Sequence, residues 1–179
     1  MTAADGELER RLRALVVDVP DFPSPGVVFR DITALVGDGG ALHDAVSAMA
    51  APFAGDGIEV VAGIESRGFI LGGAVAATLG AGFVPIRKQG KLPRATLSAE
   101  YSLEYGAAVI EVHADALAAG QRVLVVDDVL ATGGTAAAAA SLVRALAGHL
   151  AGFSFLIELR ALGGAAALDG VRRESLLVY

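Results

Sequence analysis

Residues 123–135, VLVVDDVLATGGT, place two adjacent carboxylates beside a loop of small residues. The four apolar β-formers that open the segment predict a strand buried in a parallel sheet. Asp127 and Asp128 follow, and the alanines after Thr135 predict a helix. Because open α/β sheets bind ligands at the carboxyl edge of their strands, we expect a binding site here.

The loop after the two acids has the chemistry of a phosphate site. Gly133 and Gly134 let the backbone approach a ligand closely, and Thr132 and Thr135 supply hydroxyl donors. The N-terminal end of the predicted helix attracts an anion. The loop lacks the lysine of the GxxxxGK[ST] pattern, so it does not predict a nucleoside-triphosphate P-loop.

Asp127 and Asp128 would repel a phosphate but accept hydrogen bonds from hydroxyl groups. A ligand with a phosphate at one end and a diol nearby fits both halves, and ribose 5-phosphate is such a ligand. The alternative is that the acids merely end a strand and residues 132–135 form an ordinary turn. The coincidence of buried strand, paired acids and glycine loop favours the binding site.

A second charged region lies between residues 65 and 94. It holds one acid and five cations, namely Arg67, Arg87, Lys88, Lys91 and Arg94, in a chain whose net charge is −6. A solvated cationic face is the alternative reading. The grouping around a glycine-bearing loop favours a polyanionic ligand.

Apolar spacing predicts alternating strands and helices. Helices are expected at about residues 8–16, 40–53, 68–79, 134–148 and 162–168, and strands at 58–63, 83–87, 107–113, 123–127, 152–159 and 174–178. Three prolines predict that residues 20–31 have no regular structure. This order indicates an α/β fold with a parallel sheet and helices on both faces.

Length and composition narrow the class of protein. The 179 residues suit one domain, and the absence of cysteine excludes a disulfide scaffold and fits a reducing cytoplasm. The mild negative charge, without a basic helix, gives no indication of nucleic-acid binding. Residues 68–86 are uncharged, but their five glycines and Pro85 argue against a membrane span, and the charges in residues 1–19 argue against a signal peptide.

Residues 90–108 are expected to form a long loop with few large aliphatic side chains. Loops of this length in compact domains are usually functional or disordered. Because this one carries Lys91, Arg94, Glu104 and Tyr105, we expect a lid that closes over a diphosphate and excludes water. A surface loop without a role is the alternative.

Five segments resemble the type I phosphoribosyltransferase family. Residues 127–135 look like its phosphoribosyl-pyrophosphate signature. Four further segments resemble its adenine-using members, and these are residues 21–31, 65–69, 84–94 and 101–106. The likeness runs from about residue 8 to the C-terminus and implies a single domain over 1–179. The implied fold has a central, mostly parallel twisted sheet flanked by helices, a small hood with an N-terminal helix at 1–35, and a flexible lid at 90–108.

The resemblance implies transfer of the 5-phosphoribosyl group of phosphoribosyl pyrophosphate to N9 of adenine. The products are AMP and pyrophosphate, and the setting is cytoplasmic purine salvage. It implies that Asp127 and Asp128 hold the ribose hydroxyls, and that Mg²⁺ binds mainly through the substrate rather than through protein ligands. The 5-phosphate would be held by Ala131, Thr132, Gly133, Gly134 and Thr135.

The remaining roles also come from the resemblance. Arg67 is expected to be catalytic and to bind pyrophosphate, with Arg87, Lys88 and Lys91 beside it. Glu104 is expected to be catalytic, through a hydrogen bond on the N7 side of adenine, and Tyr105 to contact substrate. The resemblance also suggests a cis peptide in the loop of residues 65–67 and a homodimer.

Base recognition is placed by the same analogy in the proline loop. Val28 and Arg30 would meet the edge of adenine, and Phe29 would cover one ring face; a core aromatic is the alternative for Phe29. Val129 would cover the other face, where the family more often has leucine. The missing methylene lowers adenine affinity by about 0.8 kcal/mol at most.

Two rival functions stay open from the sequence. One is transfer to another acceptor, such as hypoxanthine, guanine or xanthine. The other is a non-catalytic sensor that binds phosphoribosyl pyrophosphate and controls transcription. The lack of an additional DNA-binding segment, together with Glu104 and the lid cations, favours the enzyme. His43, His113 and His149 form no ligand pattern.

Overall fold

The computed structural model describes residues 3–102, 107–168 and 170–179. The chain divides into two compact units, Met1–Ala48 and Met49–Tyr179, and each is described by itself. That the chain acts as one domain with a hood at 1–35 stays a prediction.

The first unit combines helices with a two-stranded antiparallel sheet. Its elements are α1 (Ala3–Arg13), β1 (Val17–Pro20), β2 (Val28–Asp31), α2 (Thr33–Gly37) and α3 (Gly39–Ala50), the last of which runs into the second unit. The expectation that residues 20–31 lack regular structure is wrong for Pro20, which belongs to β1, and for 28–31, which form β2. Pro20 ends β1, opposite Val28, and the other two prolines lie in the turn, so none has to donate within a sheet ladder.

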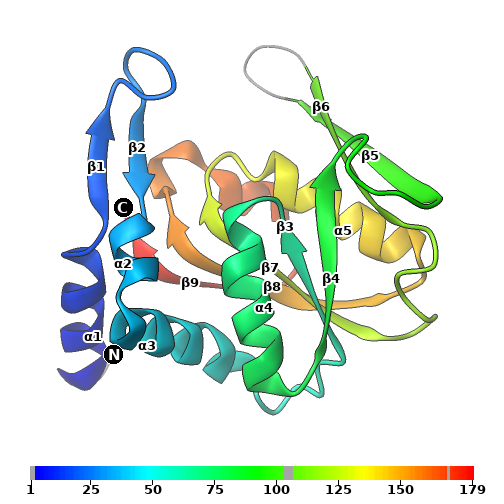
Figure 1. Cartoon of the computed structure of the whole chain (residues 1–179), viewed down its shortest axis with the longest axis horizontal. Coiled ribbons are helices and arrows are strands. Elements are labelled where there is room, and N and C mark those ends of the chain that lie inside the picture. The colour runs from blue at the N-terminus through cyan, green and yellow to red at the C-terminus, as the bar shows by residue number, and fades with distance from the viewer. Residues whose placement is uncertain (1–2, 103–106, 169) are drawn as a thin grey trace. The chain divides into compact units, whose positions relative to one another are not determined.

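The second unit contains a seven-stranded sheet. In chain order the strands are β3 (Val60–Ile64), β4 (Gly82–Lys88), β5 (Thr96–Ser102), β6 (Ala107–His113), β7 (Arg122–Leu130), β8 (His149–Glu158) and β9 (Arg173–Val178). Their order across the sheet is β5-β6-β4-β3-β7-β8-β9 (Figure 1). The five strands β4, β3, β7, β8 and β9 are parallel to one another. At one edge of the sheet β6 runs antiparallel to β4, and β5 and β6 form an antiparallel hairpin. The mostly parallel sheet is thus confirmed.

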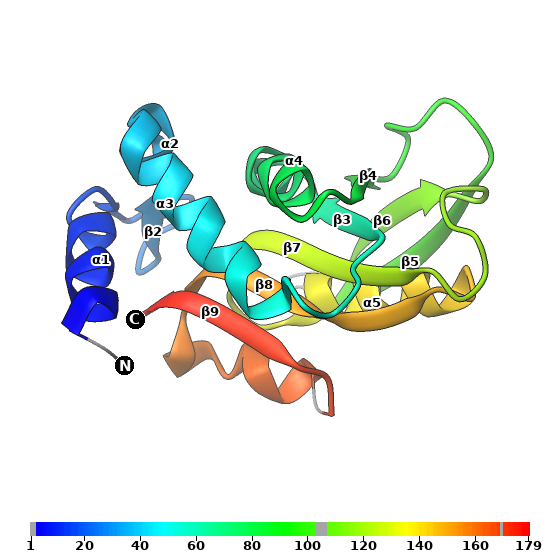
Figure 2. The same cartoon turned by 90° about the horizontal axis from the view of Figure 1, so that it is seen from below.

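Helices α4 (Arg67–Leu79) and α5 (Gly134–Ala145) lie on opposite faces of this sheet (Figure 2). Alternate residues of β3 and β7, among them Val60, Ala62 and Val125, form one buried cluster with the small residues of α5. A cluster of this kind is what a strand buried on both faces provides. The chain also has three short 3₁₀ turns, η1 (Ala51–Phe53), η2 (Arg160–Leu162) and η3 (Gly164–Leu168), the last two where one helix was expected.

The strand β5 lies within the segment expected to be a loop. Leu97, Ala99 and Tyr101 alternate along it and pack against the buried cluster, so residues 96–102 are not part of a free loop. The strand expected at 107–113 is confirmed as β6. Strand β7 also runs three residues further than expected, and Asp127 and Asp128 lie inside it rather than after it.

The carboxyl ends of β4, β3 and β7 meet at one edge of the sheet. The register pairs Ile64 with Ile86 and Gly63 with Val126, so the segments that follow these strands start side by side. This edge is where a parallel sheet binds ligands. Among the described residues, no helix is long and apolar enough to cross a bilayer.

Candidate active site

Residues 131–135, called here the phosphate loop, join β7 to α5. Gly133 is the N-cap of α5 with φ +83°, and no side chain caps the helix there. The first amides of a helix have no acceptor within the helix. Their N–H groups and the positive end of the helix dipole therefore suit an anion.

Gly133 is required by its surroundings. A Cβ at this position would lie 2.4 Å from the carbonyl oxygen of Gly164 and 2.8 Å from the Cβ of Ala167. The positive φ is also unfavourable for residues with a side chain. The turn η3 thus packs directly against Gly133 of the phosphate loop.

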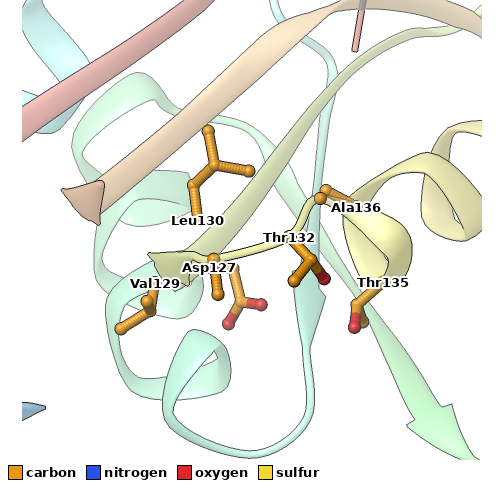
Figure 3. Close-up of a pocket in the computed structure, with 8 residues that line it drawn as sticks. Asp127, Val129, Leu130, Thr132, Thr135 and Ala136 are labelled. Atoms are coloured by element: carbon orange, nitrogen blue, oxygen red, sulfur yellow. The ribbon is translucent and has the colours of Figure 1, made fainter. Parts of the chain in front are cut away.

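A small pocket of about 60 Å³ lies beside the phosphate loop. Figure 3 shows that Asp127, Thr132 and Thr135 point toward the same side of the turn between strand and helix, while Leu130 points to the other side and is buried. The lining residues are Asp127, Val129, Leu130, Ala131, Thr132, Gly133, Thr135 and Ala136. The structure thus brings one of the paired acids together with the phosphate loop, as expected.

Asp127 is held in an environment that disfavours its charge. Burial raises the pKa of this carboxyl well above its ordinary value of 3.8, and the neighbouring Asp128 raises it further. The Asp127 Oδ1 atom accepts a hydrogen bond from the Asp128 N–H at 2.9 Å. A ligand that donates hydroxyl hydrogens to this carboxylate would relieve both effects.

Asp128 does not line the pocket but forms an ion pair with Arg67. Its side chain is 8 % exposed, and its Oδ2 atom lies 2.9 Å from Nη1 of Arg67. The first residue of α4 is thereby held at the end of β7. Arg67 is thus placed beside the paired acids, and its catalytic role stays a prediction.

Gly68 allows this approach of α4 to β7. A Cβ at Gly68 would lie 2.8 Å from Oδ1 of Asp127 and 3.0 Å from the carbonyl oxygen of Val126. Any side chain there would push the first turn of α4 away from the acids. Gly68 could not be given a role from the sequence, because only the folded structure shows which atom it faces.

Four cations are expected to bind pyrophosphate, and they are called here the cation cluster: Arg67, Arg87, Lys88 and Lys91. Glu65 contacts two of them: its Oε2 atom accepts hydrogen bonds from Nε of Arg87 and from the N–H of Lys88, both at 3.1 Å. Burial alone raises the pKa of Glu65. The Lys88 amide, Arg87 and the charge of Lys91 outweigh it, so the pKa lies below 4.5.

Arg87 is fixed from three sides. Besides Glu65, its Nη1 atom donates to the carbonyl oxygen of Lys91 at 3.1 Å, and its guanidinium carbon lies 5.9 Å from the ring centre of Phe69. The peptide bond between Glu65 and Ser66 is cis, which confirms the expectation for this loop. Glu65 was given no role from the sequence, although it is the single acid with five cations between residues 65 and 94.

Some expected site residues lie elsewhere or outside the described residues. Arg94, counted with the lid cations, pairs with Asp115. Glu104 and Tyr105 lie outside the described residues, so their roles stay predictions.

Three of the residues expected to recognise adenine, namely Val28, Phe29 and Arg30, lie on strand β2 of the β1–β2 hairpin, whereas Val129 lies in β7 and lines the pocket beside the phosphate loop. Val28 is exposed, and the ring of Phe29 packs edge-on against Phe22 at 5.1 Å between centres. Arg30 forms an ion pair with Asp18 across the hairpin. Their roles in binding adenine also stay predictions.

Comparisons with known proteins agree with this geometry. A family model described as a phosphoribosyl transferase domain matches residues 36–160. The adenine phosphoribosyltransferase of Methylococcus capsulatus is 56 % identical over 169 residues, covering 94 % of this chain and 99 % of its own length.

Solved structures give the same result. The adenine phosphoribosyltransferase of Rhodothermus marinus has a TM-score of 0.94 at 48 % identity, covering 97 % of this chain and 99 % of its own. That of Saccharomyces cerevisiae, complexed with D-2,5-dideoxy-2,5-imino-altritol 1,6-bisphosphate and adenine, has a TM-score of 0.91 at 37 % identity, covering 96 % and 99 %. The chain belongs to the phosphoribosyltransferase family and, within it, to the adenine phosphoribosyltransferases.

Proposed function

We propose that the chain transfers the 5-phosphoribosyl group of phosphoribosyl pyrophosphate to N9 of adenine, forming AMP and pyrophosphate. The observation that carries the proposal is the position of the paired acids. They lie between an uncapped helix N-terminus and Arg67 of the cation cluster. A sugar with phosphate at one end and diphosphate at the other matches this order of charges.

The phosphate loop is the proposed site of the 5-phosphate. Thr132 and Thr135 would donate from their hydroxyls, and the amides of Gly133, Gly134 and Thr135 from the backbone. The small side chain of Ala131 would leave space for the phosphate. Asp127, which faces the same pocket, would accept from the ribose hydroxyls, with Asp128 beside it.

The cation cluster is the proposed site of pyrophosphate. As this group leaves, the sugar becomes oxocarbenium-like and negative charge grows on the departing oxygens. Arg67 is close to the acids that hold the sugar, so it would stabilise that growing charge more than the ground state. Arg87, Lys88 and Lys91 would bind the outer oxygens.

Mg²⁺ is the proposed cofactor, and the residues present fit a metal held mainly through the substrate. Magnesium requires six oxygen ligands. The described residues contain no group of three or more acidic, His or Cys side chains that could hold a metal. Asp127 and Asp128 would contribute through water or ribose hydroxyls, and the metal would supply charge neutralisation to the leaving diphosphate.

Adenine is the proposed acceptor. Backbone groups of Val28 and Arg30 would meet the edge of the base, and Phe29 and Val129 would cover its two faces. Glu104 would hydrogen-bond the N7 side, with a contribution of about 10²–10⁴-fold as a general acid or base, and Tyr105 would contact substrate. We expect Glu104→Ala to keep affinity for phosphoribosyl pyrophosphate but lose turnover; unchanged kcat would remove Glu104 from the mechanism.

A cytoplasmic homodimer is the proposed working form. The lack of cysteine fits a reducing compartment. The dimer rests on the family resemblance, and sedimentation velocity tests it: a monomer throughout the active concentration range would overturn it.

The deciding experiment measures pyrophosphate release with adenine, phosphoribosyl pyrophosphate and Mg²⁺, for the wild type and for Asp127→Asn. We expect turnover with adenine and a large loss in the variant. Preference for a 6-oxopurine in the same assay would show that adenine is the wrong acceptor. Binding of phosphoribosyl pyrophosphate in a calorimeter, without release of pyrophosphate for any base, would favour the sensor.

A further inference from the structure

Glu111 is a buried acid that the proposed mechanism does not use. It lies near the middle of β6 and is 5 % exposed. Burial of an acidic side chain is costly unless its oxygens are hydrogen-bonded. The contacts of Glu111 therefore indicate what the side chain is for.

Both oxygens of Glu111 have partners on the chain that leads from β4 into the first residue of β5. Its Oε1 atom accepts from two consecutive main-chain N–H groups, those of Lys91 and Leu92, each at 3.1 Å. Its Oε2 atom lies 3.4 Å from the hydroxyl of Thr96. Glu111 thus replaces, from within the sheet, the acceptors that this segment would otherwise find in water.

Glu111 differs in its partners from Asp128 and Glu65. Asp128 and Glu65 each pair with an arginine of the cation cluster, whereas the ion pairs found among the described residues do not include Glu111. Glu111 binds main-chain amides and a hydroxyl group instead. Its effect is to fix the position of backbone rather than to neutralise a cation.

The backbone fixed in this way is that of Lys91. The N–H of Lys91 donates to Glu111, and its carbonyl oxygen accepts from Arg87. The peptide groups on both sides of the Lys91 Cα are therefore held, while its side chain is exposed. Through this carbonyl contact the backbone of Lys91 lies against Arg87 of the cation cluster, and the charge of Lys91 also lowers the pKa of Glu65.

We propose that Glu111 is a positioning residue for pyrophosphate: it holds the main chain of Lys91 so that this cation stays within the cation cluster. The inference rests on the proposed role of Lys91. A side chain on a free loop would lose more conformational entropy when it binds a ligand. Anchoring of the backbone removes part of that loss before substrate arrives.

The test compares Glu111→Leu, Glu111→Gln and Lys91→Ala by calorimetric titration with pyrophosphate and Mg²⁺. Leucine removes both acceptors at similar volume, whereas glutamine keeps an oxygen for the two amides. We expect Glu111→Leu and Lys91→Ala each to weaken pyrophosphate binding about ten-fold, the size of one lost charge-assisted hydrogen bond. Glu111→Gln should stay within about two-fold of the wild type, and KM for adenine should be unchanged in all three.

The double variant separates positioning from a general structural role. If Glu111 acts through Lys91, Glu111→Leu should have no further effect on pyrophosphate affinity in the Lys91→Ala background. Additive losses would overturn the inference. Glu100→Ala, at an exposed position of the adjoining strand β5, is the matched control and should bind pyrophosphate like the wild type.

The outcomes also distinguish this inference from the proposed function. If Lys91→Ala binds pyrophosphate normally, the proposed role of Lys91 is wrong, and the inference falls with it. If Lys91→Ala is weakened but Glu111→Leu is not, only the inference is wrong. Should Glu111→Leu fail to fold, amide hydrogen exchange of the folded Glu111→Gln and wild-type chains decides: rapid exchange at Lys91 and Leu92 in the wild type would contradict the anchoring.

Discussion

The two ends of the proposed substrate site hold anions in different ways. The phosphate loop uses backbone amides at a helix N-terminus, and its shape depends on Gly133, which has no room for a side chain. The cation cluster uses long side chains that are held by acids, such as Arg87 by Glu65. The loop should therefore tolerate almost no change of shape, whereas the cluster should lose function in graded steps as single contacts are removed.

The largest expected effect is that of Gly133→Ala in the phosphate loop. The left-handed backbone costs about 1–3 kcal/mol with a side chain, and the clash with Gly164 adds to it. We expect kcat/KM for phosphoribosyl pyrophosphate to fall about 100-fold or more. Gly120→Ala is the matched control, since Gly120 has φ +81° with open space around it. Equal activities of the two variants would show that the loop is less constrained than its geometry indicates.

Asp127→Asn should have the next largest effect, and its effects on binding and on stability should have opposite signs. Loss of the carboxyl acceptor for ribose hydroxyls should raise KM for phosphoribosyl pyrophosphate about 10- to 100-fold. Because the pKa of Asp127 is raised in the folded state, that state binds the proton more tightly than the unfolded one. The wild type should therefore lose stability relative to the variant as pH rises from about 3.8 toward the folded pKa.

Thermal melting at several pH values between 4 and 9 measures this difference. We expect the Tm of Asp127→Asn to exceed that of the wild type by an amount that grows with pH. A difference that is constant across the range would mean that the carboxyl titrates normally.

Glu65→Gln tests the cation cluster, and its pH dependence should be the reverse. The pKa of Glu65 is lowered, so its ionised form stabilises the folded state; this contribution is complete above about 4.5 and is lost as pH falls through the folded pKa. Because glutamine keeps an acceptor for Arg87 and Lys88, KM for phosphoribosyl pyrophosphate should rise only about five-fold, as for about 1 kcal/mol. Glu59→Gln is the control. The carboxylate of Glu59 accepts a hydrogen bond from the N–H of Arg122 at the start of β7, so this variant should leave KM for phosphoribosyl pyrophosphate unchanged.

Val129→Leu should have the smallest effect, and it should not change the binding of either the phosphate or the pyrophosphate group. One added methylene against the base is worth about 0.8 kcal/mol, so KM for adenine should fall about four-fold at most. KM for phosphoribosyl pyrophosphate should not change. A change in KM for phosphoribosyl pyrophosphate without a change in KM for adenine would indicate that Val129 contacts the sugar rather than the base.

The same contrast explains what the sequence could predict. The phosphate loop is local: strand, acids, loop and helix follow within residues 122–145, and each was expected in nearly its observed place. Strand β5 was not expected from the sequence, because the short alternation of Leu97, Ala99 and Tyr101 lies between charged and polar residues. Strand β2 was not expected either, because three prolines fit an irregular loop as well as they fit the end and turn of a hairpin.

The acids that hold the cation cluster could not be assigned from the sequence. Glu111 is 20 residues from Lys91 and 19 from Leu92 along the chain, and Glu65 is 22 from Arg87. These contacts depend on how β4 pairs with β6 and follows β3 in the sheet. A single acid in the apolar strand 107–113 was the available signal for Glu111, but its partners are backbone groups, which every residue has.

Glu111 also lies where the β5–β6 hairpin joins the rest of the sheet. Strand β6 pairs with β4 at the register positions of Glu111 and Ile110, whereas it pairs with β5 from His113 to Ala107. Beyond these two positions the Val109 carbonyl still accepts a hydrogen bond from the N–H of Gln89. Past Val109 the hairpin is stabilised by the packing of Leu97, Ala99 and Tyr101 against the buried cluster rather than by pairing with β4. The backbone that precedes the hairpin is therefore anchored by one acid, and the hairpin itself by apolar contacts.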